Sequence, residues 1–201
     1  MQTLGRTIFQ AIVHHQRGWV FTPRHFIRLG DPRAIGVALT HLTRKGAIRR
    51  LDRGLYDYPR QHPKLGLLSP SVDAIADALS DRDATRLQPS GAYAANLLGL
   101  SDQVPMRVLF LAAGKTRKVK IGKLEIVLKR AMPRNLAAAG RTSGLVIQAL
   151  RYLGQRHVDE SVVAKLRDRL SPKDKAQLLQ DLRFAPAWIA AIMRAVAREK
   201  A

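Results

Sequence analysis

Arginine side chains are concentrated in one short segment, Ala47 to Tyr56, where their spacing suits contact with a phosphate backbone. Arg49, Arg50 and Arg53 lie inside this segment, and Arg60 follows closely. Guanidinium groups donate paired hydrogen bonds to phosphate oxygens, so this segment favours nucleic-acid binding. A basic β-hairpin directly after a helix is typical of a winged helix-turn-helix, in which the hairpin contacts the DNA backbone and the helix enters the major groove.

The helix before this hairpin has its own start and stop signals. Asp31-Pro32 supplies an N-cap and a first-turn proline, and Gly46 supplies a left-handed terminator after Lys45. An apolar stripe on one face would pack inward, and it consists of Ile35, Ala38, Leu39 and Leu42. The residues of the opposite face that we expect to contact DNA are Arg33, Val37, Thr40, His41 and Arg44. Arginine can bind guanine through two hydrogen bonds, and a valine methyl can touch a thymine methyl.

Two further helices should complete this first domain. Apolar residues at helical spacing predict a helix from about Thr3 to Gln16. Trp19-Val20-Phe21 is expected to form a short extended piece. Thr22-Pro23 then supplies an N-cap and first-turn proline for a second helix that runs to about Leu29.

Candidate catalytic motifs are incomplete. Gly114-Lys115-Thr116 looks like the end of a phosphate-binding loop, but Leu109 stands where that motif needs glycine, and a strand is expected to follow. The cationic block offers only Glu125, and Asp73 and Asp77 lack a third metal ligand. The six histidines show no metal-ligand spacing. Ser90, Ser143 and Tyr93 would need a neighbouring base. We therefore expect neither an enzyme, a metal nor a cofactor.

The net charge of +20 favours a polyanionic partner, and it is unevenly distributed along the 201 residues. Residues 1–60 carry 11 basic and 3 acidic side chains, whereas residues 103–158 carry 12 basic side chains and one acid. The second block predicts a secondary basic surface formed by Lys115, Arg117, Lys118, Lys120, Lys123, Lys129 and Arg130. Either phosphates or an acidic partner protein could cover it.

The second half of the chain predicts strands followed by helices. Strand-like runs occur at Val108–Ala112, Arg117–Ile121 and Leu124–Lys129, with Gly122-Lys123 as a hairpin turn between the last two. Apolar stripes then indicate several helices, one of which starts at a capping box, Ser171-Pro172-Lys173-Asp174. The predicted fold class is therefore α+β: a winged helix-turn-helix domain (1–60), a linker (61–70) and a C-terminal mixed domain (71–201) with a small antiparallel sheet and several helices.

Two segments resemble one known family. The hairpin Gly46-Ala47-Ile48-Arg49-Arg50-Leu51-Asp52-Arg53-Gly54-Leu55-Tyr56 looks like the wing of the AbiEi family, the antitoxin and transcriptional repressor of bacterial type IV toxin–antitoxin systems. Pro89-Ser90-Gly91-Ala92-Tyr93-Ala94-Ala95-Asn96-Leu97-Leu98-Gly99-Leu100, followed by Gln103-Val104-Pro105, resembles the segment that opens the C-terminal domain of that family. The resemblance covers roughly residues 1–135.

The resemblance implies a repressor of its own operon that neutralises a toxin similar to a nucleotidyltransferase, with or without forming a direct complex with it. Carried over by position, it implies DNA contacts by Arg33, Thr40, Arg44, Arg49, Arg50 and Arg53. The expected ligand is double-stranded DNA from the protein's own promoter, with repeated sequences in it. Either a homodimer or cooperating monomers would bind it. A nucleic-acid-docking enzyme and a non-specific DNA- or RNA-binding protein stay open as alternatives. The N-terminus shows no signal peptide and the chain no membrane span or cysteine, so we expect a cytoplasmic protein.

Overall fold

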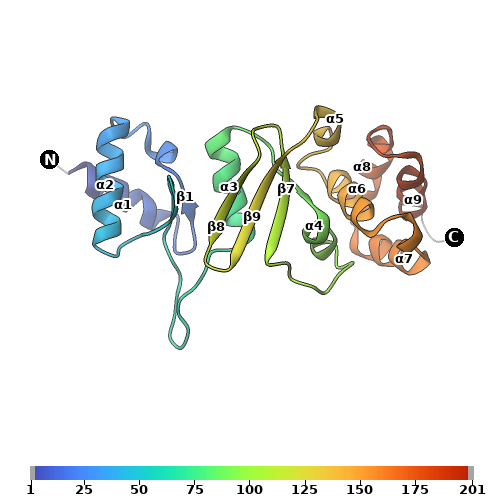
Figure 1. Ribbon diagram of the computed structural model, residues 1–201, viewed down its shortest axis with the longest axis horizontal. Coiled ribbons are helices and arrows are strands. Elements are labelled where there is room, and N and C mark those ends of the chain that lie inside the picture. The colour runs from blue at the N-terminus through green and yellow to red at the C-terminus, as the bar shows by residue number, and fades with distance from the viewer. Residues whose placement is uncertain (1–2, 199–201) are drawn as a thin grey trace. The chain divides into compact units, whose positions relative to one another are not determined.

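The computed structural model describes residues 3–198, and in this range it contains nine α-helices and three small sheets (Figure 1). The fold is therefore of the mixed α+β class that the sequence predicts. Contacts divide the chain into two compact units, one ending at Ala84 and the other beginning at Thr85. Within residues 3–198, no helix is both long enough and apolar enough to span a membrane.

The first unit contains three α-helices, a short 3-10 helix and five short strands. In chain order these elements are α1 (Leu4–His14), β1 (Val20–Phe21), η1 (Pro23–Phe26), α2 (Pro32–Arg44), β2 (Arg49–Asp52), β3 (Leu55–Asp57), β4 (Gln61–His62), β5 (Gly66–Leu67) and α3 (Val72–Asp83). β3 is the central strand of an antiparallel three-stranded sheet, with β1 on one side and β2 on the other. β4 and β5 form a separate exposed hairpin.

The core of the first unit joins the inward faces of α1 and α2 to the sheet. Its fully buried side chains include Ile8, Ile12, Phe21, Ile35 and Leu39. Burial of each such side chain stabilises the fold by about 1.5–3 kcal/mol, measured as transfer from water. The predicted apolar stripe of α2 packs into this core. Its packing determines which side chains of the helix point to solvent.

The second predicted helix is shorter than expected. It is a single 3-10 segment, η1, and the predicted helix to Leu29 is wrong. The amides of Ile27 and Leu29 donate to carbonyl oxygens three residues earlier, at 3.3 and 2.8 Å, which is the hydrogen-bond pattern of a 3-10 turn. The Nδ1 atom of His25 accepts from the amide of Thr22 at 3.2 Å and holds the start of this turn.

The boundary between the two units lies after α3, whereas the sequence places it at residues 61–70. Side chains of the first unit hold both ends of the connecting segment. Arg49 Nη2 donates to the carbonyl oxygen of Leu68 at 2.8 Å, and Arg24 Nη1 donates to that of Arg82, near the C-terminus of α3, at 2.9 Å. α3 also packs against β1. Residues 61–84 are therefore structural members of the first unit.

The second unit begins with a four-stranded sheet and continues into helices (Figure 1). In chain order its elements are β6 (Gln88–Ser90), α4 (Gly91–Leu97), β7 (Arg107–Ala112), β8 (Arg117–Ile121), β9 (Leu124–Arg130), α5 (Pro133–Leu136), α6 (Thr142–Leu153), η2 (Gln155–His157), α7 (Glu160–Arg169), α8 (Pro172–Gln180), η3 (Leu182–Phe184) and α9 (Ala187–Ala197). The strand order is β6-β7-β9-β8, which makes β8 an edge strand. The sheet rests on α4, where the rings of Tyr93 and Phe110 meet edge to face at 5.7 Å.

The predicted hairpin is confirmed, but the predicted purely antiparallel sheet is wrong. β8 and β9 pair antiparallel and are joined by the two-residue turn Gly122-Lys123. β9 then enters the sheet between β8 and β7, and it runs parallel to β7. Since the chain goes from β7 to the edge strand β8 before it returns, the direction of β9 matches that of β7 and the sheet is mixed.

The helical part of the second unit is held together at the N-terminus of α6. The carboxylate of Asp181 is 1% exposed. It accepts hydrogen bonds from Arg141 Nη1 at 2.8 Å, from Gln177 at 3.0 Å and from the hydroxyl of Ser143. The predicted capping box at Ser171 and Asp174 is confirmed. Carboxylates near a helix N-terminus are favoured by the helix dipole, so these groups stabilise the bundle.

Candidate nucleic-acid interface

The outward face of α2 is the largest cluster of predicted DNA-contacting residues. Five residues of this face are exposed: Arg33, Val37, Thr40, His41 and Arg44. The opposite face is buried, since Ile35 and Leu39 are no more than 1% exposed. Val37 is 57% exposed, which is unusual for a branched apolar side chain in the middle of a helix. We call these five residues the α2 face.

The local sequence explains why this helix begins and ends where it does. The carboxylate of Asp31 accepts from the amides of Arg33 and Ala34 at 2.9 and 3.2 Å, as its predicted N-cap role requires. Gly46 follows the helix with a φ of +69°, a value that favours glycine. A Cβ atom added at Gly36 would meet nothing within 4 Å, so internal packing does not require a glycine there. A small residue at this position leaves the helix surface open to close approach.

The β2–β3 hairpin follows α2 through residues 45–48. Its turn is Arg53-Gly54, because Asp52 pairs with Leu55, and Gly54 has a φ of +67°. The side chains of Arg50 and Arg53 are exposed. Among the residues that the structure describes, Arg50 makes a single long hydrogen bond of 3.4 Å, from its Nε to the carbonyl oxygen of Asp52. These two arginines therefore present their charge to solvent.

Arg49 has a different role from its predicted one. Its Nε and Nη2 atoms donate to the two carboxylate oxygens of Asp57 at 3.0 and 2.6 Å, and Nη2 also donates to the carbonyl oxygen of Leu68. Asp57 is 1% exposed. Its hydrogen bonds with Arg49 raise the pKa of that guanidinium above its ordinary value. The paired donors of Arg49 are thus engaged inside the unit and not free for a phosphate.

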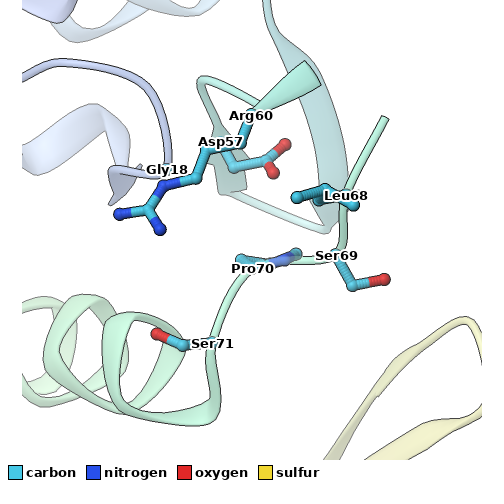
Figure 2. Close-up of a pocket in the computed structure, with 7 residues that line it drawn as sticks. All are labelled: Gly18, Asp57, Arg60, Leu68, Ser69, Pro70 and Ser71. Carbon is cyan, nitrogen blue, oxygen red and sulfur yellow. The ribbon is translucent and has the colours of Figure 1, made fainter. Parts of the chain in front are cut away.

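A pocket of about 190 Å³ lies beside this ion pair (Figure 2). Its lining residues are Gly18, Asp57, Arg60, Leu68, Ser69, Pro70 and Ser71. The Nε atom of Arg60 donates to the carbonyl oxygen of Arg17 at 3.1 Å, and Figure 2 shows this side chain extending toward Gly18. Ser71 Oγ accepts from the amide of Ala74 at 3.2 Å. Because these polar groups already serve internal contacts, the pocket is a structural junction at the base of the hairpin.

The predicted secondary basic surface is divided by the pleat of the sheet. Lys118, Lys120 and Lys129 are exposed and share one face. Arg117 pairs in register with the buried Leu128 and so belongs to the opposite face. Lys115 lies in the loop before β8, Lys123 in the β8–β9 turn and Arg130 at the end of β9. The sequence missed a further cation, Arg107, which β7 places in the same row as Glu125 and Lys120.

Several residues that the sequence raised as catalytic candidates serve internal contacts. Gly114-Lys115-Thr116 leads into the strand β8 and not into the helix that should directly follow a phosphate-binding loop. The hydroxyl of Ser143 donates to Asp181, and that of Ser90 donates to Gln148 at 3.1 Å. The pKa of Asp77 is raised by burial and by its acidic neighbours on α3. Among residues 3–198, no cluster of three or more potential metal ligands occurs.

Comparisons with known proteins give a family but no activity. No curated protein matches the chain. One family match covers residues 7–178, and it includes α2, the β2–β3 hairpin and the complete sheet of the second unit. This match does not link the chain to the AbiEi family, so that resemblance stays a prediction. The chain belongs to a protein family described as a family of unknown function (DUF6088).

Proposed function

We propose that the first unit is a winged helix-turn-helix that binds double-stranded DNA in a sequence-dependent manner. α2 is the recognition helix in this proposal, and the β2–β3 hairpin is the wing. The observation that carries it is the α2 face, a set of cationic, hydroxyl and apolar side chains that point to solvent while the other side of the helix is buried. Arginine, threonine and valine are side chains that contact base edges in the major groove.

The charge of the exposed residues supports this proposal. Arg50 and Arg53 on the proposed wing are exposed. In this proposal they contact phosphates, and such contacts position a protein on DNA without reading its sequence. The same surface would not suit a protein partner as well, because cores of protein interfaces are depleted of charged residues. The proposed function is therefore transcriptional regulation, and repression of the protein's own operon is the form that the resemblance to the AbiEi family implies.

The antitoxin role is a separate proposal that rests on the resemblance of two segments to the AbiEi family. The second segment forms β6, α4 and the start of the following loop. Its test is genetic. A neighbouring gene for a protein similar to a nucleotidyltransferase should arrest growth when expressed alone, and the full chain should relieve that arrest.

The DNA-binding proposal is tested by fluorescence anisotropy with the full chain. One duplex carries the DNA upstream of the chain's own gene and another carries a scrambled sequence, each titrated at several salt concentrations. We expect the native duplex to bind at least about a hundredfold more tightly at physiological salt, as specific regulators do. Equal affinities that fade together with salt would contradict sequence-dependent binding.

Substitutions separate the two proposed contacts. Arg33→Gln or Arg44→Gln should cost about 1–3 kcal/mol on the native duplex and little on the scrambled one, since base contacts carry specificity. Arg53→Gln should weaken both duplexes and make the slope of log K against log salt about one unit shallower. Arg6→Gln, at an exposed position of α1, is the matched control for loss of one charge. If the Arg33 and Arg44 variants bind every sequence normally, α2 is not the recognition helix.

A further inference from the structure

On strands β7, β9 and β8, one face of the sheet is core, and the other carries exposed cations around the buried Val127. The register aligns Arg107, Glu125 and Lys120 in one row across β7, β9 and β8. The next row of the same face holds Leu109, Val127 and Lys118, and the row after it holds Leu111 and Lys129. Figure 1 shows these three strands side by side. We call this surface the cationic sheet face.

Side chains of the opposite face form core. Val108, Ile126 and Val119 form one of its rows, and each is no more than 2% exposed. The ring of Phe110 on that face meets Tyr93 of α4. In contrast, the side chains of Arg107 and Lys118 are 67% and 64% exposed. The pleat therefore places four cations, Arg107, Lys118, Lys120 and Lys129, on the side away from this core, whereas Arg117 and Arg130 follow the register of the opposite face.

The cations of this face are not explained by internal ion pairs. Glu125 is the single acid there, and it lies 3.6 Å from Arg107 Nε and 3.6 Å from Lys118 Nζ. Pairs of this length between exposed side chains contribute little to stability. Within residues 3–198, Lys120 and Lys129 make no ion pair. Strand geometry places Lys118 and Lys120 about 7 Å apart on the same side, so they repel each other unless an anion is present.

Protection of the sheet edge explains only part of the pattern. Lysines on an edge strand discourage pairing with other chains, and β8 is such a strand. Arg107 and Lys129 lie on the interior strands β7 and β9, where this explanation does not apply. A ligand with several closely spaced negative charges accounts for the cations of all three strands.

We propose that the cationic sheet face binds the sugar-phosphate backbone of nucleic acid, as a second contact that does not read sequence. Neither aromatic rings nor amide side chains occur at the eight positions that β7, β8 and β9 contribute to it. The one amide that β6 places on this side of the sheet, Gln88, is only 1% exposed. Base stacking and base-edge hydrogen bonds are therefore not available from these positions. Four cations against one acid give the face a net positive charge. This contact is independent of the α2 face, and it gives the second unit a binding role of its own.

The test uses the full chain in an Arg33→Gln, Arg44→Gln background, so that failure of the proposed recognition helix cannot obscure the result. The probes are a duplex and a single strand of unrelated sequence, titrated by anisotropy between 50 and 200 mM salt. Replacing Lys118, Lys120 and Lys129 by glutamine should make the log K against log salt slope shallower by about 2.7 on the duplex and about 2.1 on the single strand. For the duplex, raising the salt from 50 to 200 mM should then reduce the affinity of the triple variant by a factor about fortyfold smaller than for the parent protein.

A matched control removes the same charge elsewhere in the second unit. Lys165, Lys173 and Arg194 are exposed on α7, α8 and α9, and their replacement by glutamine should leave both slopes nearly unchanged. A response of either nucleic acid to the sheet variant alone supports the proposal and identifies the form that is bound. Equal responses to the sheet and control variants would show a general effect of net charge and would overturn it.

A second variant changes binding in the opposite direction, which loss of folding cannot imitate. Glu125→Gln keeps the size of the side chain and removes the one negative charge of the face. It should tighten binding of the responding nucleic acid by about two- to fivefold, because one repulsive charge near the phosphates is lost. The proposal is refuted if Glu125→Gln does not tighten binding and the triple lysine variant keeps the salt dependence of the parent protein. An acidic protein would then be the remaining candidate partner of this face.

Discussion

The ion pair between Arg49 and Asp57 makes a sharp prediction about the first unit, because Asp57→Asn removes the charge and keeps the shape. Removal of one member of a buried pair costs about 3–5 kcal/mol when the other stays buried. The side chain of Arg49 is 31% exposed, so part of its guanidinium can regain water. Two hydrogen bonds to a charged group are lost or weakened at the same time. We therefore expect Asp57→Asn to lower the free energy of unfolding by about 2–3 kcal/mol.

The assay is urea unfolding of the full chain followed by tryptophan fluorescence. Each unit holds one of the two tryptophans, Trp19 and Trp188, so a Trp188→Phe background reports on the first unit alone. A double-mutant cycle with Arg49→Met should give a coupling energy of about 1.5–3 kcal/mol. Arg50→Met is the control, since it removes a charge from the same strand without a carboxylate partner, and it should stay within about 0.5 kcal/mol.

Two results would refute this reasoning. The first is an Asp57→Asn variant that unfolds within about 0.5 kcal/mol of the wild type, because a buried pair cannot be that neutral when broken. The second is a coupling energy below about 0.5 kcal/mol, which would mean that the two side chains act independently.

The remaining predictions concern the second unit. Hydrogen bonds from the Ser171 and Thr142 hydroxyls lower the pKa of Asp174 in the folded state. The ionised carboxylate therefore stabilises the fold at any pH above the pKa of about 3.9 that Asp has in the unfolded chain. This stabilisation is lost as the pH falls through the lower pKa of the folded state. At pH 7, Asp174→Asn should lower the free energy of unfolding by no more than about 1 kcal/mol. The difference between this variant and the wild type should shrink below about pH 4, and a constant difference would contradict the argument. Gly144→Ala should lower the free energy of unfolding by about 1–3 kcal/mol, because its Cβ would clash with the carbonyl oxygen of Ala138. Gly114→Ala, where a Cβ meets nothing within 4 Å, is the control in Trp188-monitored unfolding, and equal losses at both glycines would contradict the packing argument.

Features encoded by neighbouring residues could be predicted from the sequence. Asp31-Pro32 and Gly46 define α2 because a cap and a terminator act on the residues beside them, and the observed helix is Pro32–Arg44. Gly122-Lys123 predicts the β8–β9 hairpin for the same reason. The outward residues of α2 followed from helical periodicity once the apolar stripe was identified.

Features that depend on distant partners could not be predicted. In sequence, Arg49 is one more arginine of a basic hairpin, and only the pairing of β2 with β3 shows that Asp57 lies opposite it. The proline in Gln88-Pro89-Ser90 argues against a strand, yet β6 forms at an edge of the sheet, where a missing amide donor is tolerated. Arg107 carries no local signal either, because its place on the cationic sheet face follows from the parallel register of β7 and β9.

The attachment of α3 to the first unit changes what counts as the smallest autonomously folding fragment. A polypeptide that stops at residue 60 would lack two hydrogen-bond acceptors of the first unit. Arg49 would lose the carbonyl oxygen of Leu68, and Arg24 would lose that of Arg82. It would also uncover the side of β1 that α3 packs against. The natural limit for expressing this half alone is therefore near Ala84, and a shorter piece that fails to bind DNA would report lost folding and not a missing contact.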